Sequence, residues 1–108
     1  SQNMAIKQIE FAPEFENDLE DIFNRMKDIS SVHKAQDFID KVFNKIEFLR
    51  EFPYLGQKEV FIKKNRDLDY RYLVVEDCKI LYRVINDMIL VAYIFDTRQN
   101  PKKLKIKK

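Results

Sequence analysis

A chain of 108 residues with 45% apolar residues, one Gly and three Pro is expected to form one compact domain, which excludes a disordered protein. The single cysteine, Cys78, excludes an internal disulfide, and no apolar run approaches the ~20 residues of a membrane span, so we expect a cytoplasmic protein without a membrane partner. The net charge of +2 combines an acidic part (residues 1–57, 7 Lys and Arg against 11 Asp and Glu) with a basic part (residues 58–108, 13 against 7), an asymmetry that suits a polyanionic partner, either nucleic acid or an acidic protein segment.

By composition the chain divides into three parts. Residues 1–3 precede Met4 and look like the remnant of an expression tag, residues 4–101 form the expected domain, and residues 102–108 form a tail with five lysines. Without the tail, the rest of the chain would be mildly acidic. The tail either binds a polyanion or is a solvated end that aids solubility.

The first half is predicted to hold one strand and two helices. Residues 5–11 have the short alternation of a strand, which Ala12-Pro13 ends. Apolar residues then recur at helical spacing in two stripes, and Pro13 and Ser30 or Ser31 suit the two helix starts. Because the connection is only a few residues long, the helices are expected to form an antiparallel hairpin that covers one face of a sheet. The stripes comprise Phe15, Leu19, Ile22, Phe23 and Met26, then Ala35, Phe38, Ile39, Val42, Phe43, Ile46 and Leu49.

The second half is predicted to form the sheet. Residues 71–101 read as three antiparallel strands, because β-branched and aromatic residues fill them and Glu76-Asp77 and Asn86-Asp87 suit two-residue turns. Residues 60–64 follow the turn at Gly56 and are a candidate for a further strand. The predicted element order is β-α-α-β-β-β(-β), an α+β fold in which the helix pair packs on one face of an antiparallel sheet.

Two-residue turns would pair Val75 with Cys78 and Ile85 with Met88, and the strand period of two then assigns each side chain to a face. A nearly all-apolar face should lie under the helices, while a mixed face of cations, phenols and aliphatics should be open. A bulge would exchange the faces beyond it. The apolar face comprises Arg71, Leu73, Val75, Cys78, Ile80, Tyr82, Val84, Ile89, Val91, Tyr93 and Phe95. The open face comprises Tyr70, Tyr72, Val74, Lys79, Leu81, Arg83, Ile85, Met88, Leu90, Ala92, Ile94, Asp96 and Arg98.

Four motifs follow one another along the chain. They are the segment from Ala35 to Phe52-Pro53-Tyr54-Leu55-Gly56, then Arg71-Tyr72-Leu73, then Lys79-Ile80-Leu81-Tyr82-Arg83-Val84, and finally Ile94-Phe95-Asp96-Thr97-Arg98-Gln99-Asn100-Pro101. In this order and spacing the chain resembles, from Ile6 onward, the RelE/ParE superfamily of bacterial toxins from type II toxin–antitoxin systems. The resemblance implies a growth-arresting toxin of the plasmid-stabilisation kind, held in check by a cognate acidic antitoxin.

One branch of this superfamily cleaves messenger RNA on the ribosome, and resemblance to it implies an endoribonuclease that needs no cofactor or metal. Such cleavage requires a base near the 2′-hydroxyl, cations at the phosphate and an acid for the leaving oxygen. By resemblance, the catalytic candidates are Lys79, Arg98 and Asp96; the RNA- or phosphate-binding candidates are Arg83, Lys63, Lys64, Tyr70 and Tyr72. This mRNA cleavage is the favoured interpretation of the sequence.

The sequence departs from the nuclease pattern at residues 96–98, where several such toxins carry a histidine. The only histidine, His33, falls in a predicted helix. Asp96 would need a raised pKa to act as the base, or Glu76 would need to fold inward, whereas Asp96 beside Arg98 is more simply a structural ion pair. The sequence also lacks a Gly-rich phosphate loop, a His and Cys metal cluster, and a nucleophile with a plausible base.

Two alternatives to mRNA cleavage remain open. The branch similar to ParE has no chemistry of its own and traps DNA gyrase on broken DNA, in which case Lys79, Arg83 and Arg98 belong to the scaffold or contact the antitoxin. The chain is otherwise an inactive binding module. In each case the antitoxin is expected to cover aliphatic side chains on the open face, namely Leu90, Ala92 and Ile94.

Overall fold

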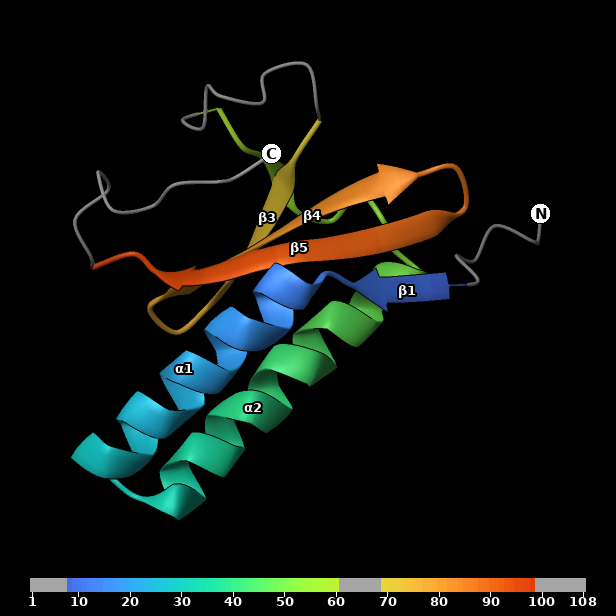
Figure 1. Cartoon of the computed structure of the whole chain (residues 1–108). Coiled ribbons are helices and arrows are strands. Elements are labelled where there is room, and N and C mark those ends of the chain that lie inside the picture. Colours follow the sequence, from blue (N-terminus) through green and yellow to red (C-terminus); the bar gives the residue numbers. More distant parts are fainter. Residues whose placement is uncertain (1–7, 61–68, 99–108) are drawn as a thin grey trace.

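The computed structural model of the chain describes residues 8–60 and 69–98 (Figure 1). Two helices lie side by side against one face of a five-stranded sheet, which confirms the predicted α+β fold. The tag remnant, the lysine tail and most of the candidate strand at residues 60–64, with Lys63 and Lys64, lie outside the described residues. The elements are β1 (Gln8–Phe11), α1 (Pro13–Ile29), α2 (Val32–Glu47), the 3₁₀ turn η1 (Phe48–Arg50), β2 (Gln57–Lys58), β3 (Arg71–Val75), β4 (Cys78–Ile85) and β5 (Met88–Asp96).

The two helices begin where the sequence predicts. Pro13 occupies the first turn of α1, and the Ser31 hydroxyl accepts a hydrogen bond from the Lys34 backbone N–H (3.1 Å) at the start of α2. The helices turn back on each other within two residues, and their apolar stripes face the sheet. Together with one face of β3, β4 and β5 they form the main core. Within the described ranges, neither helix is long and apolar enough to cross a membrane.

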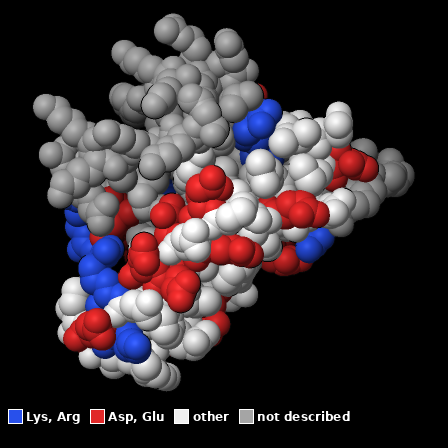
Figure 2. Space-filling view, viewed as in Figure 1, with Lys and Arg blue, Asp and Glu red and all other residues white. Residues whose placement is uncertain are grey.

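The outer surface of α1 is acidic along most of its length. Figure 2 shows Asp and Glu side chains gathered over this helix. Five of its six carboxylates lie between residues 14 and 21, whereas both of its cations, Arg25 and Lys27, lie in the last third. The charge of α1 therefore changes from negative to mixed towards its C-terminal end.

The sheet has the strand order β1-β5-β4-β3-β2. The edge strand β1 runs parallel to β5 and pairs Gln8 with Met88, whereas all other neighbours are antiparallel. The sheet is therefore mixed. Two parallel strands need a long crossover connection, and here the elements from α1 to β4 form that connection between β1 and β5. The opposite edge, β2, is only two residues long and was not among the predicted strands.

The motif at residues 52–56 is held by a buried phenol. The Tyr82 hydroxyl donates to the Pro53 carbonyl (2.9 Å) and accepts from the Gly56 N–H (2.8 Å). A Cβ atom at position 56 would lie 2.6 Å from the Tyr72 carbonyl oxygen, so only glycine fits. An Arg71 Nη1 also donates to the Gly56 carbonyl (2.8 Å). These contacts fix the path of the chain from the helices into β2.

Both predicted hairpin turns are confirmed. Val75 pairs with Cys78 and Ile85 pairs with Met88, and the first turn residues, Glu76 and Asn86, have φ angles of 54° and 56°. A positive φ at this position is what a two-residue hairpin needs to match the twist of its strands.

The predicted faces are correct for β3, β4 and the first part of β5, but they are wrong beyond a bulge. Leu81 pairs with Tyr93 and Tyr82 pairs with Val91, so Ala92 is an extra residue in β5. Beyond Ala92 the side chains exchange faces. Tyr93 and Phe95 pack on the open face, and Ile94 joins the core under the helices.

Candidate functional site

Lys79 lies on the open face of the sheet, in contact with an aromatic ring and a carboxylate. Its Nζ atom is 4.0 Å from the centroid of the Tyr72 ring and 3.4 Å from Oε1 of Glu59. The Glu59 side chain is only 2% exposed, and the Lys79 side chain is 21% exposed. A cation held by a buried carboxylate is partly neutralised, so this lysine is less available to a phosphate than the sequence suggests.

Arg83 and Tyr70 lie on the same face as Lys79. The Arg83 guanidinium is 6.0 Å from the centroid of the Tyr70 ring, and its buried Nε atom has no hydrogen-bond partner among the described residues. Tyr70 is buried with Leu81 and Ala92, and burial raises the pKa of its phenol. The Tyr70 ring is therefore part of a small second core and is not free to stack on a base.

Asp96 and Arg98 form a two-point ion pair at the end of β5. Arg98 Nε donates to Asp96 Oδ1 (3.0 Å) and Nη2 donates to Oδ2 (2.6 Å), while Nη1 lies 3.3 Å from Oδ2 of Asp77. Thr97 adds two hydrogen bonds to the Asp77 carbonyl. The hydrogen bonds from Arg98 hold the pKa of Asp96 below its usual value. The structural ion pair expected as the simpler interpretation is therefore present.

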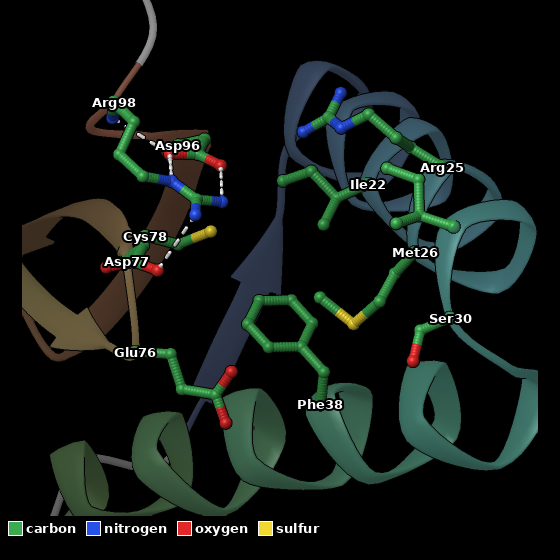
Figure 3. A pocket seen from close by; sticks show the side chains of 11 residues that line it. Ile22, Arg25, Met26, Ser30, Phe38, Glu76, Asp77, Cys78, Asp96 and Arg98 are labelled. Carbon is green, nitrogen blue, oxygen red and sulfur yellow. Dashed lines mark hydrogen bonds and ion pairs between the residues drawn. The ribbon is translucent and has the colours of Figure 1, made fainter.

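The Asp96–Arg98 pair borders a cavity of about 160 Å³ between the helix hairpin and the turn that joins β3 to β4. Figure 3 shows Ile22, Met26 and Phe38 pointing into this space from the helices, with Cys78 opposite them on the sheet. Burial raises the pKa of the Cys78 thiol to about 11, so the thiol is neutral and unreactive at neutral pH. The cavity has an apolar interior and a charged rim.

The structure does not bring the three predicted cations together. Asp96 is the register partner of Cys78 and shares its face under the helices, whereas Lys79, the next residue, points to the open face. Lys79 and Arg83 thus lie on one side of the sheet, and the Asp96–Arg98 pair borders a cavity on the other. The expectation that residues 79, 83 and 98 emerge together is wrong, because the Ala92 bulge shifts the alternation by one residue.

The remaining candidates for a base or a metal ligand are dispersed. Glu76 is exposed and pairs with Lys41 (2.7 Å), and it does not fold inward. His33 lies on the exposed side of α2, 3.6 Å from Asp37. In the described parts of the chain, no group of three or more His, Cys, Asp or Glu side chains is arranged to hold a metal ion.

Comparison with known proteins identifies the family. The sequence model of one family, the ParE toxin of type II toxin-antitoxin system, parDE, matches residues 9–101. The chain belongs to the ParE toxin family. A solved structure described as the chromosomal ParDE TA system from P. aeruginosa has a similar fold, with a TM-score of 0.69 and 16% sequence identity over 86% of this chain and 98% of that chain. None of the curated proteins compared with the chain matches it.

A ParE toxin of a type II system has an antitoxin partner, but the surface predicted for that partner is largely buried. Ala92 is 4% exposed, within the second core. Ile94 is 1% exposed, on the helix side of the sheet. Leu90 is half-buried on the open face. The expectation that these three aliphatics form an exposed surface is therefore wrong for Ala92 and Ile94.

Two side chains of this ParE toxin matter to the site and were not predicted. Glu59 neutralises Lys79, but it follows a strand of two polar residues that carries no apolar pattern. Arg25 lies on the rim of the cavity, but on the sequence it is one charge among many on α1. Neither has a local sequence signal, because each owes its place to contacts between distant elements.

Proposed function

We propose that this ParE toxin arrests growth by binding DNA gyrase and trapping it on cleaved DNA, without chemistry of its own. The observation that carries the proposal is the separation of the candidate catalytic residues by the Ala92 bulge. Cleavage of RNA through its 2′-hydroxyl needs a base, a cation and an acid within hydrogen-bond reach of one phosphate. Residues on opposite faces of a sheet do not meet this requirement.

The protonation state of Asp96 supports the same proposal. A general base works best with a pKa near the operating pH, whereas the hydrogen bonds from Arg98 lower the pKa of Asp96. The carboxylate also accepts hydrogen bonds from two guanidinium nitrogens and from the Arg98 backbone N–H (2.8 Å). Asp96 is better suited to fixing the end of β5 than to accepting a proton from RNA.

The family also favours gyrase over the ribosome. The matching sequence model is that of the ParE toxin, and ParE is the branch for which the resemblance in the sequence implies binding to DNA gyrase. On this proposal Lys79 and Arg83 contribute positive charge to a binding surface, while Asp96 and Arg98 stabilise the fold. The favoured sequence interpretation, ribosome-dependent mRNA cleavage, becomes the alternative that the experiment must separate.

The test uses the purified toxin with DNA gyrase, relaxed plasmid and ATP. We expect loss of supercoiling and accumulation of linear plasmid when the samples are denatured, because trapped gyrase leaves both strands broken. Toxin premixed with the antitoxin from the adjacent gene is the control and should restore supercoiling. Translation reactions with the same toxin, analysed by primer extension, should show intact mRNA. Cleaved mRNA together with normal supercoiling would refute the proposal.

A further inference from the structure

The cavity beside Asp96 and Arg98 is large enough for one apolar side chain. Its volume of about 160 Å³ is close to the ~150 Å³ of an engineered cavity that binds benzene. The side chains that form its interior are Ile22, Met26, Phe38 and Cys78, which offer almost no polar group to a ligand. A phenyl ring or a branched aliphatic group is therefore the chemistry that fits.

The apolar surface continues out of the cavity at the tip of the helix hairpin. Ile29 borders the cavity and is 77% exposed, and Val32, just beyond the turn, is 59% exposed. Apolar side chains that are this exposed next to an open cavity are typical of an interaction surface. The occupant is thus expected to be part of a protein segment that also covers the hairpin tip.

The charges on the rim indicate that this segment is acidic. All three carboxylates on the rim already have cationic partners: Glu76 pairs with Lys41, and Asp77 and Asp96 pair with Arg98. Arg25 has no ion-pair partner within residues 8–60 and 69–98. Together with Arg25, the cations Lys41 and Arg98 balance the three carboxylates, and Arg25 acts on Asp96 only from beyond ion-pair distance. Arg25 can therefore form a direct ion pair with a carboxylate of a bound segment, which favours an acidic segment.

The charge distribution along α1 directs an acidic segment to the same place. The first half of the helix carries five carboxylates and would repel such a segment, whereas the end that borders the cavity carries Arg25 and Lys27 against the single carboxylate of Asp28 and is net positive. Repulsion along one half of α1 and attraction at the other would also fix the orientation of the bound segment.

We propose that this cavity is the anchor site for the antitoxin, in which one apolar side chain of an acidic antitoxin segment fills the cavity and a neighbouring carboxylate pairs with Arg25. The proposal rests on membership of the ParE toxin family and not on gyrase as the target. It places the antitoxin at the hairpin tip, in place of the buried aliphatics Ala92 and Ile94.

The test measures the affinity of the full-length toxin for the full-length antitoxin encoded by the adjacent gene. Ser30 lies on the rim, and Ser30→Phe places a ring in the cavity mouth; Asn24→Phe adds the same ring to the exposed side of α1. We expect Ser30→Phe to weaken binding about 100-fold, as loss of a central anchor does, and Asn24→Phe to change it less than about twofold.

A second pair of variants tests the charge. Arg25→Glu should weaken binding about tenfold, while Lys27→Glu, with the same charge change outside the cavity lining, should have a smaller effect. Thermal unfolding and growth arrest without antitoxin serve as controls for the fold. Wild-type affinity in both Ser30→Phe and Arg25→Glu would overturn the proposal, and so would intact affinity combined with lost growth arrest, which would assign the cavity to the target.

Discussion

The parts of β5 before and after Ala92 have the same kind of sequence but opposite surroundings. Before the bulge, alternate residues such as Leu90 face the open side; after it, Ile94 and Asp96 face the helices although they continue the same alternation. The comparison shows that a single extra residue reassigns every side chain beyond it. It also shows that side chains can be assigned to a sheet face from their alternation only as far as the first bulge in the strand.

The largest expected effect is a difference in the free energy of unfolding between variants on the two sides of Ala92 in β5. Ile94→Ala should lower the free energy of unfolding by about 3 kcal/mol, because it opens a hole in the core under the helices. Leu90→Ala removes a similar side chain from a half-buried position and should cost about 1 kcal/mol. Urea unfolding monitored by circular dichroism measures both. Equal losses would mean that the alternation continues unbroken through Ala92.

A smaller effect is expected from replacing the carboxylates of Asp18 and Asp96, whose contributions to stability should depend on pH in opposite ways. Burial, together with the nearby charges of Asp21 and Glu14, raises the pKa of Asp18 to about 6, so its ionised form opposes folding. Asp18→Asn should therefore stabilise the protein by about 1 kcal/mol at pH 7.5, after allowance for screening by solvent, and should have little effect at pH 4.

Asp96 is expected to behave in the opposite way. Its pKa is lowered in the folded state, so its contribution is present above the ordinary pKa of an aspartate and is lost as the pH falls through the folded value. Asp96→Asn should destabilise the protein at pH 7.5 and less so near pH 3. Unfolding curves at the two ends of the range measure both variants, and a shift of the same sign for both would contradict the assigned environments.

The smallest expected effect concerns toxicity. Lys79→Ala removes charge from the proposed binding surface, and Arg98→Ala removes the ion pair that stabilises the end of β5, so each should weaken growth arrest about threefold under titrated induction. The double variant should weaken it about tenfold, because the free-energy effects of separate sites add. Residues of one catalytic centre behave differently, since a second loss adds little to the first. If the double variant arrests growth as well as the weaker single variant does, Lys79 and Arg98 act in one catalytic centre, contrary to their separation in the structure.

Local sequence information was sufficient for the elements and their turns. The structures of these elements depend on residues that are close in the sequence. Examples are the helical stripes, the serine before α2, and the turn residues at 76–77 and 86–87. The ion pair of Asp96 with Arg98 was accessible for the same reason, since the two residues are two positions apart.

The remaining features depend on contacts between distant segments. The bulge has no marker at Val91-Ala92-Tyr93, because no glycine or proline interrupts the alternation there. The parallel placement of β1 and the two-residue strand β2 follow from pairing across the whole sheet. Glu59 and Arg25 acquire their roles only when β2 meets β3 and when α1 meets the end of β5.

The buried thiol of Cys78 provides a natural reporter of motion in this part of the molecule. It is the only cysteine of the chain and lines the cavity, and only the thiolate reacts with disulfide reagents. Labelling is therefore slow while the thiol stays buried and protonated, and a transient parting of the helix hairpin from the sheet would speed it up. A partner seated in the cavity would slow the same reaction, and the kinetics of one sulfur atom would then follow assembly without any added dye.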